Sequence, residues 1–322
     1  SPFVGGAAEM VAARIGDYAR HFAATAPDFD IFHAGDGISG NALADLKADG
    51  RIAGFARTVH HIDDFSDLRL AALQERSIVE ADELFVVSEL WRREIRQRFD
   101  RDATLVGNGV DIALFTPQPD ERDSALRQTL GLGQGPVFLT VGGVEQRKNS
   151  VRLLEAFIEL RAILPTAQLV IAGGASLLDH SACRAVFDAR LRASALPSNA
   201  VILTGPLGQA DMPALFRACD VFAFPSLKEG FGLVVLEAMA CGAPVVLSSL
   251  RPFTEYLREN EAVWCDPTSP SNIAGAMVSA LAPALRARLV QTGAAAARRH
   301  DWLHVARSCL PAYARLLERA YA

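Results

Sequence analysis

The residues best suited to chemistry lie in the segment 224–240, where two glutamates flank a glycine-rich turn. We predict that a buried strand ends at Phe224 and that a helix begins near Gly232, with Glu229 before the helix and Glu237 inside it. Ligands of parallel sheets bind beyond the carboxyl ends of the strands, and a helix N-terminus offers unpaired amides to an anion. The segment is therefore a candidate seat for an anionic ligand.

The spacing of the two glutamates indicates what they can do. Glu229 and Glu237 are eight residues apart, so they would lie roughly 12 Å apart along a helix and about 80° apart around it. That separation suits two carboxylates that bracket an extended ligand. It is too long for an acid and a base that act on one bond, for which separations of about 5 to 9.5 Å apply. Two surface acids around a tight turn are the alternative interpretation.

A second candidate is the segment 140–150, which reads Thr-Val-Gly-Gly-Val-Glu-Gln-Arg-Lys-Asn-Ser. It combines a strand, the glycines Gly142 and Gly143, the cations Arg147 and Lys148, and a serine that can cap a helix. Such a segment can seat a diphosphate, because glycine amides approach phosphates closely and the cations offset the phosphate charge. For the Arg-Lys dipeptide alone, a solvated pair at a helix start is the more common arrangement.

The first segment resembles the E-x7-E signature of retaining glycosyltransferases of the two-Rossmann type, GT-B, and specifically their large family 4. The match continues through residues 240–246, Ala-Cys-Gly-Ala-Pro-Val-Val. Weaker agreements extend the resemblance from about His33 to Glu255. They are Val87-Ser88, Asn108-Gly109-Val110-Asp111, Gly173-Gly174 and Thr204-Gly205-Pro206-Leu207.

The resemblance implies a role for each matching residue. In the family the first Glu holds hydroxyls of the donor hexose, the amides of the following Gly-Phe-Gly meet the sugar and the phosphates, and the second Glu accepts from the ribose hydroxyls. Glu229 and Glu237 correspond to these two glutamates. The donor-binding residues expected from the resemblance are Gly142, Gly143, Arg147, Lys148, Leu207, Glu229, Gly230, Phe231, Gly232, Leu233 and Glu237.

The second segment departs from the family pattern at one position. The family usually has Gly-Arg-(Leu/Ile) here, with a Lys five residues after the Arg. This chain keeps the lysine, Lys148, but has Gly143 in place of the arginine. We expect Arg147 to supply the second cation, as in a Gly-Gly-(Val/Ile)-x-x-Arg-Lys-Asn variant of the family. Which cation meets which phosphate is left open.

The N-terminal half carries histidines at two predicted strand ends. The family often has Thr-x-His near the donor hexose, and His60 fits that count in the segment 57–61, with His61 as the competing candidate. A lone histidine at a strand end is more often structural. Residues 33–36 resemble the family's His-x-x-Asp loop, which faces the acceptor. The candidate catalytic residues are therefore His60, Arg147, Lys148 and Glu229.

The elements that position these residues alternate along the chain. Short apolar runs separate helical periods, which is typical of βα units and of parallel sheets. The segment 108–135 is rich in Pro and Gly and indicates a connection. Strands are predicted over residues 30–33, 56–59, 84–87 and 104–106 before this connection, and over 137–141, 168–172, 201–203, 221–223, 244–247 and 262–265 after it. From residue 272 onward the chain is predicted to be mostly helical, with Pro283 and Pro311 as breaks or kinks.

We therefore expect an α/β protein of GT-B architecture, with two Rossmann-like parallel-sheet domains that face a cleft. Residues 1–112, joined by the C-terminal helix 304–322, would form the acceptor-side domain, and residues 113–303 the nucleotide-sugar domain. Family members normally carry roughly two further βα units of about 30 residues each before the region that 30–36 resembles. The N-terminal domain is accordingly expected to be incomplete and the chain truncated.

Composition narrows the class of protein. The chain has 322 residues, 50% of them apolar and 21% charged, and a net charge of −5, which disfavours a bulk nucleic-acid binder. Five cysteines without a CxxC pair favour a reducing compartment, so we expect a cytoplasmic protein. No run approaches the roughly 18 apolar residues of a membrane span, and peripheral membrane contact is left open.

The resemblance implies an enzyme that moves a hexose from a UDP-sugar or GDP-sugar to an unidentified acceptor, a saccharide, lipid or small molecule, with retention at the anomeric carbon. It implies no metal and no further cofactor. In this reaction the leaving diphosphate helps to deprotonate the acceptor. Two alternatives stay open, an inactive fragment that binds nucleotide sugars and a nucleotide-sugar epimerase on the same fold.

Overall fold

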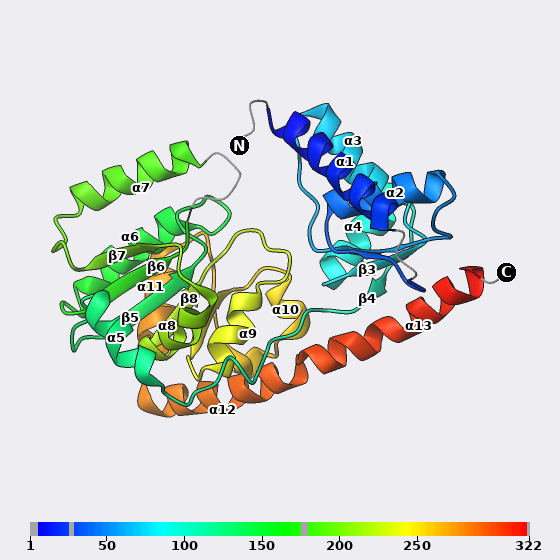
Figure 1. Cartoon of the computed structure of the whole chain (residues 1–322). Coiled ribbons are helices and arrows are strands. Elements are labelled where there is room, and N and C mark those ends of the chain that lie inside the picture. The colour runs from blue at the N-terminus through cyan, green and yellow to red at the C-terminus, as the bar shows by residue number, and fades with distance from the viewer. Residues whose placement is uncertain (1–5, 26–28, 175–179, 321–322) are drawn as a thin grey trace. The chain divides into compact units, whose positions relative to one another are not determined.

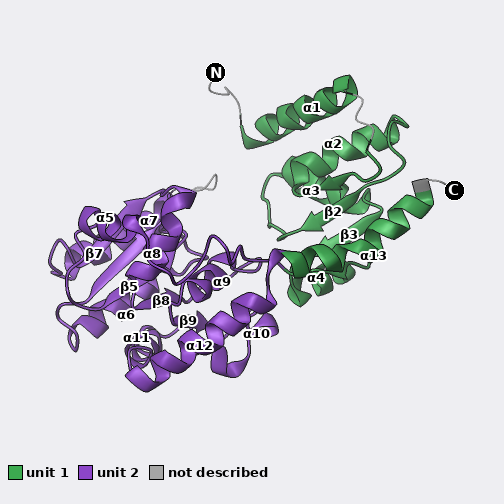
Figure 2. Ribbon diagram, turned by 60° about the horizontal axis from the view of Figure 1, so that its bottom comes forward, with its two compact units in different colours: residues 1–107, 303–322 green, residues 108–302 purple. Residues whose placement is uncertain are grey.

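The structure, a computed structural model, describes residues 6–25, 29–174 and 180–320 of the chain (Figure 1). The chain forms two compact units. Unit 1 comprises residues 1–107 and 303–322, and unit 2 comprises residues 108–302 (Figure 2). Each unit contains a parallel sheet flanked by helices, and each is described by itself below.

Unit 1 is built on a four-stranded parallel sheet in the order β1-β2-β3-β4. The two central strands are buried along their whole length, although β2 carries Arg57 and Thr58 and β3 begins with Glu83. The strands are His33–Ala34, Ala56–Val59, Glu83–Val86 and Thr104–Leu105, and the helices are α1 (Ala7–Thr25), α2 (Gly37–Ala48), α3 (Leu68–Val79), α4 (Glu89–Phe99) and α13 (Trp302–Ala320).

Helix α13 comes from the end of the chain but packs on the sheet of unit 1 (Figure 2). Its Val305, Ala312 and Leu316 share a buried cluster with Phe85 of β3. Arg315 adds an ion pair, with Nη2 2.6 Å from Oε2 of Glu83. The helix therefore completes the apolar core of a unit whose other elements lie far earlier in the chain, as the separation of 232 residues in this ion pair illustrates.

Unit 2 is built on a six-stranded parallel sheet in the order β10-β9-β8-β5-β6-β7. The chain winds outward from β5 to β7 and then restarts beside β5 with β8, so the strand order reverses between β5 and β8. Its strands are β5 (Val137–Val141), β6 (Gln168–Ala172), β7 (Val201–Gly205), β8 (Val221–Phe224), β9 (Val245–Ser248) and β10 (Val263–Cys265). Its helices are α5 (Glu121–Thr129), α6 (Ser150–Arg161), α7 (Ser181–Ala193), α8 (Met212–Ala218), α9 (Leu233–Ala240), α10 (Phe253–Tyr256), α11 (Pro270–Ser279) and α12 (Pro283–Arg299), with short 3-10 turns at Gln209–Asp211 and Glu259–Glu261.

Most predicted strands occur where the apolar runs placed them, and 137–141 and 168–172 agree residue for residue. The strand predicted over 30–33 is wrong in position, because the sheet pairing begins at His33. Within the predicted connection 108–135 the structure has helix α5. Asp120 caps this helix by accepting from the Arg122 amide. Pro283 marks a break, as predicted, because α11 ends before it and α12 begins with it, which its fixed φ allows at a first helical position, whereas Pro311 lies inside α13.

Among the described residues, no single helix has both the length and the apolar stretch to cross a membrane, and one bent pair, α11 with α12, meets that test by length and composition only. Residues 321 and 322, at the end of the predicted helix 304–322, lie outside the described residues.

Candidate functional site

The two candidate segments follow neighbouring strands at the reversal of strand order in unit 2. Gly142 comes directly after β5, and Pro225 directly after β8. The two strands are paired, with Leu139 opposite Phe222, so both segments leave the same edge of the sheet. In open parallel sheets this point, beyond the carboxyl ends of the strands, is where ligands bind.

Helix α9 presents unpaired amides at this edge. Gly232 precedes the helix with φ of 88° and supplies no side-chain cap. A side chain is excluded there, because a Cβ would stand 2.7 Å from Cε1 of Phe253. Within the described chain the amides of Leu233 and Val234 donate to no acceptor. The N-terminus of α9 therefore offers free donors and partial positive charge to an anion.

Lys148 and Glu229 form a buried ion pair beside this helix start. Lys148 Nζ donates to Glu229 Oε1 at 2.7 Å, with 10% of the lysine side chain and 6% of the glutamate side chain exposed. The ammonium also lies 4.4 Å from the centroid of the Phe224 ring. Burial lowers the pKa of Lys148, while the neighbouring Glu229 favours the charged ammonium. The two segments are thus joined by a cation and an acid that both belong to the predicted site.

Arg147 extends the charge cluster toward solvent. Its Nε lies 2.8 Å from Oε2 of the buried Glu145, and its Nη1 lies 3.5 Å from Oε1 of Glu229. His180 approaches the other carboxylate oxygen of Glu145 at 3.5 Å. Since 43% of the Arg147 side chain is exposed, this guanidinium is accessible to a ligand.

Gly142 and Gly143, which follow β5, allow the backbone of this segment to lie close to the backbone at the end of β6. The amides of Gly142 and Gly143 both donate to the carbonyl of Ala172, at 2.8 and 3.0 Å. A Cβ on Gly143 would stand 2.8 Å from the carbonyl oxygen of Gly174, and one on Gly173 would stand 2.7 Å from the Gly143 nitrogen. In this structure the two amides are already paired, so the positive charge of this segment comes from Arg147 and Lys148.

Glu237 lies on α9 without a partner for its carboxylate among the described residues. Burial raises its pKa to about 7. A buried acid without a partner can be protonated or can accept hydrogen bonds from a ligand. Acids whose pKa is strongly shifted are typical of functional sites.

The predicted donor-binding residues Phe231 and Leu207 differ in burial. The Phe231 ring is buried and stacks on Tyr256, with centroids 4.2 Å apart, and its carbonyl accepts from the Tyr256 hydroxyl at 3.1 Å. The Phe231 ring is therefore closed to a ligand. Leu207 is half-buried and lies two residues beyond β7.

Two features of the site were missed from the sequence. Buried Asn149, in a left-handed conformation, donates from Nδ2 to the carbonyls of Pro225 and Pro267, at 3.0 and 2.6 Å. These two hydrogen bonds hold the turn that carries Lys148 in place. A pocket of about 420 Å³ opens beside Gly143, with His180 and Arg184 in its wall. The position of Asn149 before a helix was the available signal for the first feature, and the second had none.

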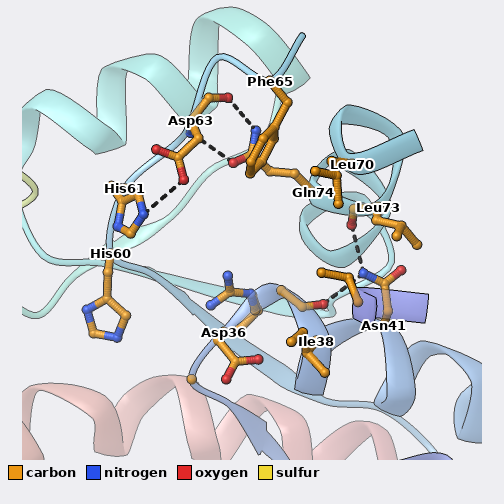
Figure 3. Close-up of a pocket in the computed structure, with 14 residues that line it drawn as sticks. Asp36, Ile38, Asn41, His60, His61, Asp63, Phe65, Leu70, Leu73 and Gln74 are labelled. Atoms are coloured by element: carbon orange, nitrogen blue, oxygen red, sulfur yellow. Dashed lines mark hydrogen bonds and ion pairs between the residues drawn. The ribbon is translucent and has the colours of Figure 1, made fainter. Parts of the chain in front are cut away.

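The predicted histidines belong to unit 1, whereas the donor-site residues belong to unit 2. Figure 3 shows His61 turned toward Asp63, at 3.1 Å between Nε2 and Oδ2, while His60 points away from that aspartate. Partial desolvation and the charge of Arg57 lower the pKa of His60. His33 uses both ring nitrogens internally, with the Tyr313 hydroxyl and the Thr58 hydroxyl each at 2.7 Å.

Comparisons with known proteins identify the family of the chain. The family described as "Glycosyl transferases group 1" matches residues 122–295. The D-inositol 3-phosphate glycosyltransferase of Salinispora arenicola is 35% identical over 241 residues, 70% of this chain and 52% of that protein. The enzyme of the same name from Acidothermus cellulolyticus is 32% identical over 315 residues, 88% of this chain and 67% of that protein. The phosphatidyl-myo-inositol mannosyltransferase of Mycobacterium tuberculosis is 33% identical over 237 residues, 70% of this chain and 58% of that protein.

Solved structures share the fold at lower identity. Sucrose-phosphate synthase from Thermosynechococcus elongatus aligns with a TM-score of 0.80 and 22% identity, covering 99% of this chain and 82% of that chain. HepE of Anabaena, solved in complex with UDP-glucose, aligns with a TM-score of 0.80 and 21% identity over 94% of this chain and 82% of that chain. The chain spans about half to two thirds of the length of the curated relatives it matches. Its two parallel-sheet units have the GT-B fold, and by sequence the chain belongs to the glycosyl transferases of group 1.

Proposed function

We propose that the protein is a hexosyltransferase whose donor is a nucleoside-diphosphate sugar bound at the reversal point of the sheet in unit 2. The observation that carries this proposal is the juxtaposition, at one sheet edge, of the unpaired amides of α9 with the cation of Lys148. Amides at a helix N-terminus and an ammonium group are the groups that hold a diphosphate. HepE, which shares the fold, was solved with UDP-glucose, and this supports UDP as the first nucleotide to test.

The charges at the site favour transfer through stabilisation of the leaving group. The bond between the anomeric carbon and the diphosphate oxygen breaks, and a bond from the same carbon to the acceptor oxygen forms on the same face, with retention. The acceptor proton passes to the departing phosphate. Arg147, Lys148 and the α9 amides would stabilise the charge that develops on the diphosphate, and these cations supply that charge without a metal.

Glu229 would have to exchange partners when the donor binds. In the structure Lys148 neutralises it, whereas a bound diphosphate would attract the ammonium toward the phosphate oxygens. Glu229 Oε1 would then be free to accept hydrogen bonds from hexose hydroxyls. Glu237, which has no partner among the described residues and has a pKa of about 7, would accept from the ribose hydroxyls.

A ligand panel tests the proposal. The full chain is melted with UDP, GDP, UDP-sugars and GDP-sugars, because a ligand at about 100 times its Kd stabilises the folded state by about 2.7 kcal/mol. That free energy raises the melting temperature by roughly 5 to 10 °C for a unit of this size. If no nucleoside diphosphate shifts the melting temperature, the proposal is rejected.

Product analysis then separates the classes of activity. With a binding donor and acceptors that include inositol and its phosphates, which the names of the relatives suggest, transfer yields a glycosylated acceptor and a free nucleoside diphosphate. An epimerase would convert the sugar without an acceptor, and an inactive fragment would leave the donor intact. Either of these last two results contradicts hexosyl transfer.

A further inference from the structure

Glu145 is a buried acid that the proposed transfer does not use. It lies between β5 and α6, and only 3% of the residue is exposed. Its amide donates to Ser150 Oγ at 3.1 Å, and the Ser150 hydroxyl donates to the Gly143 carbonyl at 3.0 Å. The first residue of α6 therefore fixes the backbone of Glu145. A buried carboxylate costs free energy unless a partner offsets its charge, so the groups that surround it indicate its role.

Two basic side chains lie against this carboxylate. Oε2 of Glu145 is 2.8 Å from Nε of Arg147, and Oε1 is 3.5 Å from Nε2 of His180. The contact with Arg147 is the shorter of the two. Oε2 accepts no hydrogen bond from the described residues, so attraction between the charges places the guanidinium while its Nε–H group stays available to a ligand.

The backbone of Arg147 is fixed, but its side chain is less constrained. The Arg147 carbonyl accepts from the amide of Leu227 at 2.8 Å, and Leu227 belongs to the turn between β8 and α9. By contrast, 43% of the Arg147 side chain is exposed, and an arginine side chain has many rotamers. The contact with Glu145 therefore limits where the guanidinium can lie.

A second acid competes for the same guanidinium. Nη1 of Arg147 lies 3.5 Å from Oε1 of Glu229, the oxygen that also accepts from Lys148 Nζ at 2.7 Å. Without Glu145 the guanidinium would be drawn closer to Glu229, because the attraction between opposite charges grows as their separation falls. Two cations would then hold Glu229, and both Arg147 and Glu229 would be less accessible to a donor. Glu145 keeps the arginine between the two acids.

We propose that Glu145 is a positioning residue for donor binding, which holds the guanidinium of Arg147 where its N–H groups meet the diphosphate. The inference rests on the proposed function, because the diphosphate is that of the nucleotide sugar. Glu145 does not contact the ligand itself and acts only through Arg147. In this it differs from Glu229, whose proposed role is to accept hydrogen bonds from the hexose.

The direction of one effect separates positioning from simple electrostatics. Glu145→Gln removes a negative charge near the site, so electrostatics alone would strengthen the binding of an anion. Positioning predicts that UDP affinity falls about 10-fold, which is about 1.4 kcal/mol and within the range for residues of one ion-pair network. Affinity for uridine, which has no phosphate, should stay as in wild type. Unchanged or tighter UDP binding, or an equal loss of uridine affinity, would overturn the proposal.

A double-mutant cycle tests whether Glu145 acts through Arg147. Calorimetry measures the UDP affinity of the full chain for wild type, Glu145→Gln, Arg147→Met and the variant that carries both substitutions. Arg147→Met should weaken UDP binding, and the addition of Glu145→Gln should cause no further loss. An equal loss from Glu145→Gln in both backgrounds would assign the acid to the packing of its segment or to His180, and would contradict the proposal.

Two further variants control for charge and for folding. Glu155→Gln removes an acid that pairs with Arg190 at 2.9 Å, and it should leave UDP affinity unchanged. Glu145→Asp keeps the charge on a shorter side chain, so the cycle can be repeated with it if Glu145→Gln does not fold, and its loss of affinity should also vanish beside Arg147→Met. Wild type that binds neither UDP nor GDP rejects the donor site and this inference together. If GDP alone binds, GDP and guanosine replace UDP and uridine, and a contrary result then rejects this inference alone.

Discussion

Replacing Glu237 by Gln should stabilise the protein at alkaline pH while weakening donor binding. The carboxylate is held without a partner among the described residues, and burial raises its pKa from the ordinary 4.5 to about 7. Between these two pH values the folded state holds a proton that the unfolded state releases. Stability from this group is therefore fully present below pH 4.5 and is lost as the pH rises through about 7.

The size of the effect follows from the two pKa values. They differ by about 2.5, and each pKa unit corresponds to about 1.4 kcal/mol, so the carboxylate destabilises the fold by at most about 3 kcal/mol at pH 8. Glutamine has no charge to bury. The variant should therefore gain about 1 to 3 kcal/mol relative to wild type between pH 4.5 and pH 8.

Urea unfolding of wild type, Glu237→Gln and the control Glu159→Gln at pH 4.5 and pH 8 measures this difference. Glu159 lies on the exposed face of α6, and its replacement should change stability equally little at both pH values. In the same variants UDP affinity should fall about 10- to 100-fold for Glu237→Gln only, because a hydrogen bond to a charged group contributes about 1.5 to 3 kcal/mol. A stability difference that does not change with pH, or unchanged UDP affinity, would refute the reasoning.

The other predictions concern the Lys148–Glu229 ion pair and the close backbone approach at Gly173. Lys148→Met should lower the free energy of unfolding by about 3 kcal/mol or more, because it leaves Glu229 buried without its closest partner. Arg147→Met should cost less, because the guanidinium is half-exposed and His180 remains close to Glu145; equal losses would contradict the assigned burial. Gly173→Ala should lower the melting temperature by several degrees, since φ is 121° and the new Cβ meets backbone at 2.7 Å. The control Gly275→Ala, inside α11 with open space at its Cβ, should stabilise by about 0.4 to 1 kcal/mol, and a stable Gly173→Ala would exclude the close approach.

The strands and the chemistry-bearing segments could be predicted because their signals are local. Strands such as 137–141 are buried on both faces and read as continuous apolar runs. The strand-to-helix turn before α9 is marked by glycine, which alone tolerates the conformation of Gly232. Helix α5 was missed because the Pro and Gly around it outweighed the capping signal of Asp120.

Tertiary features were not predictable in the same way. The pairing of Lys148 with Glu229 joins residues 81 positions apart, and nothing local indicates it. The amides of Gly142 and Gly143 were expected to face phosphates, but which acceptor they meet depends on β6, whose Ala172 carbonyl takes both. Arg57 lies in a segment that the sequence singled out for its histidines, and only the packing around it shows that its guanidinium is buried and that its Nε has no hydrogen-bond acceptor.

A structure of the protein with UDP-glucose tests the central claim most directly. We predict that the diphosphate lies at the N-terminus of α9, within hydrogen-bond distance of the Leu233 amide and Lys148 Nζ, with the ribose hydroxyls at Glu237. Lys148 should also have moved from Glu229 toward the phosphate oxygens. UDP-glucose bound away from the edge where β5 and β8 end, or bound there while the Lys148 ammonium points away from the phosphates, would contradict the account.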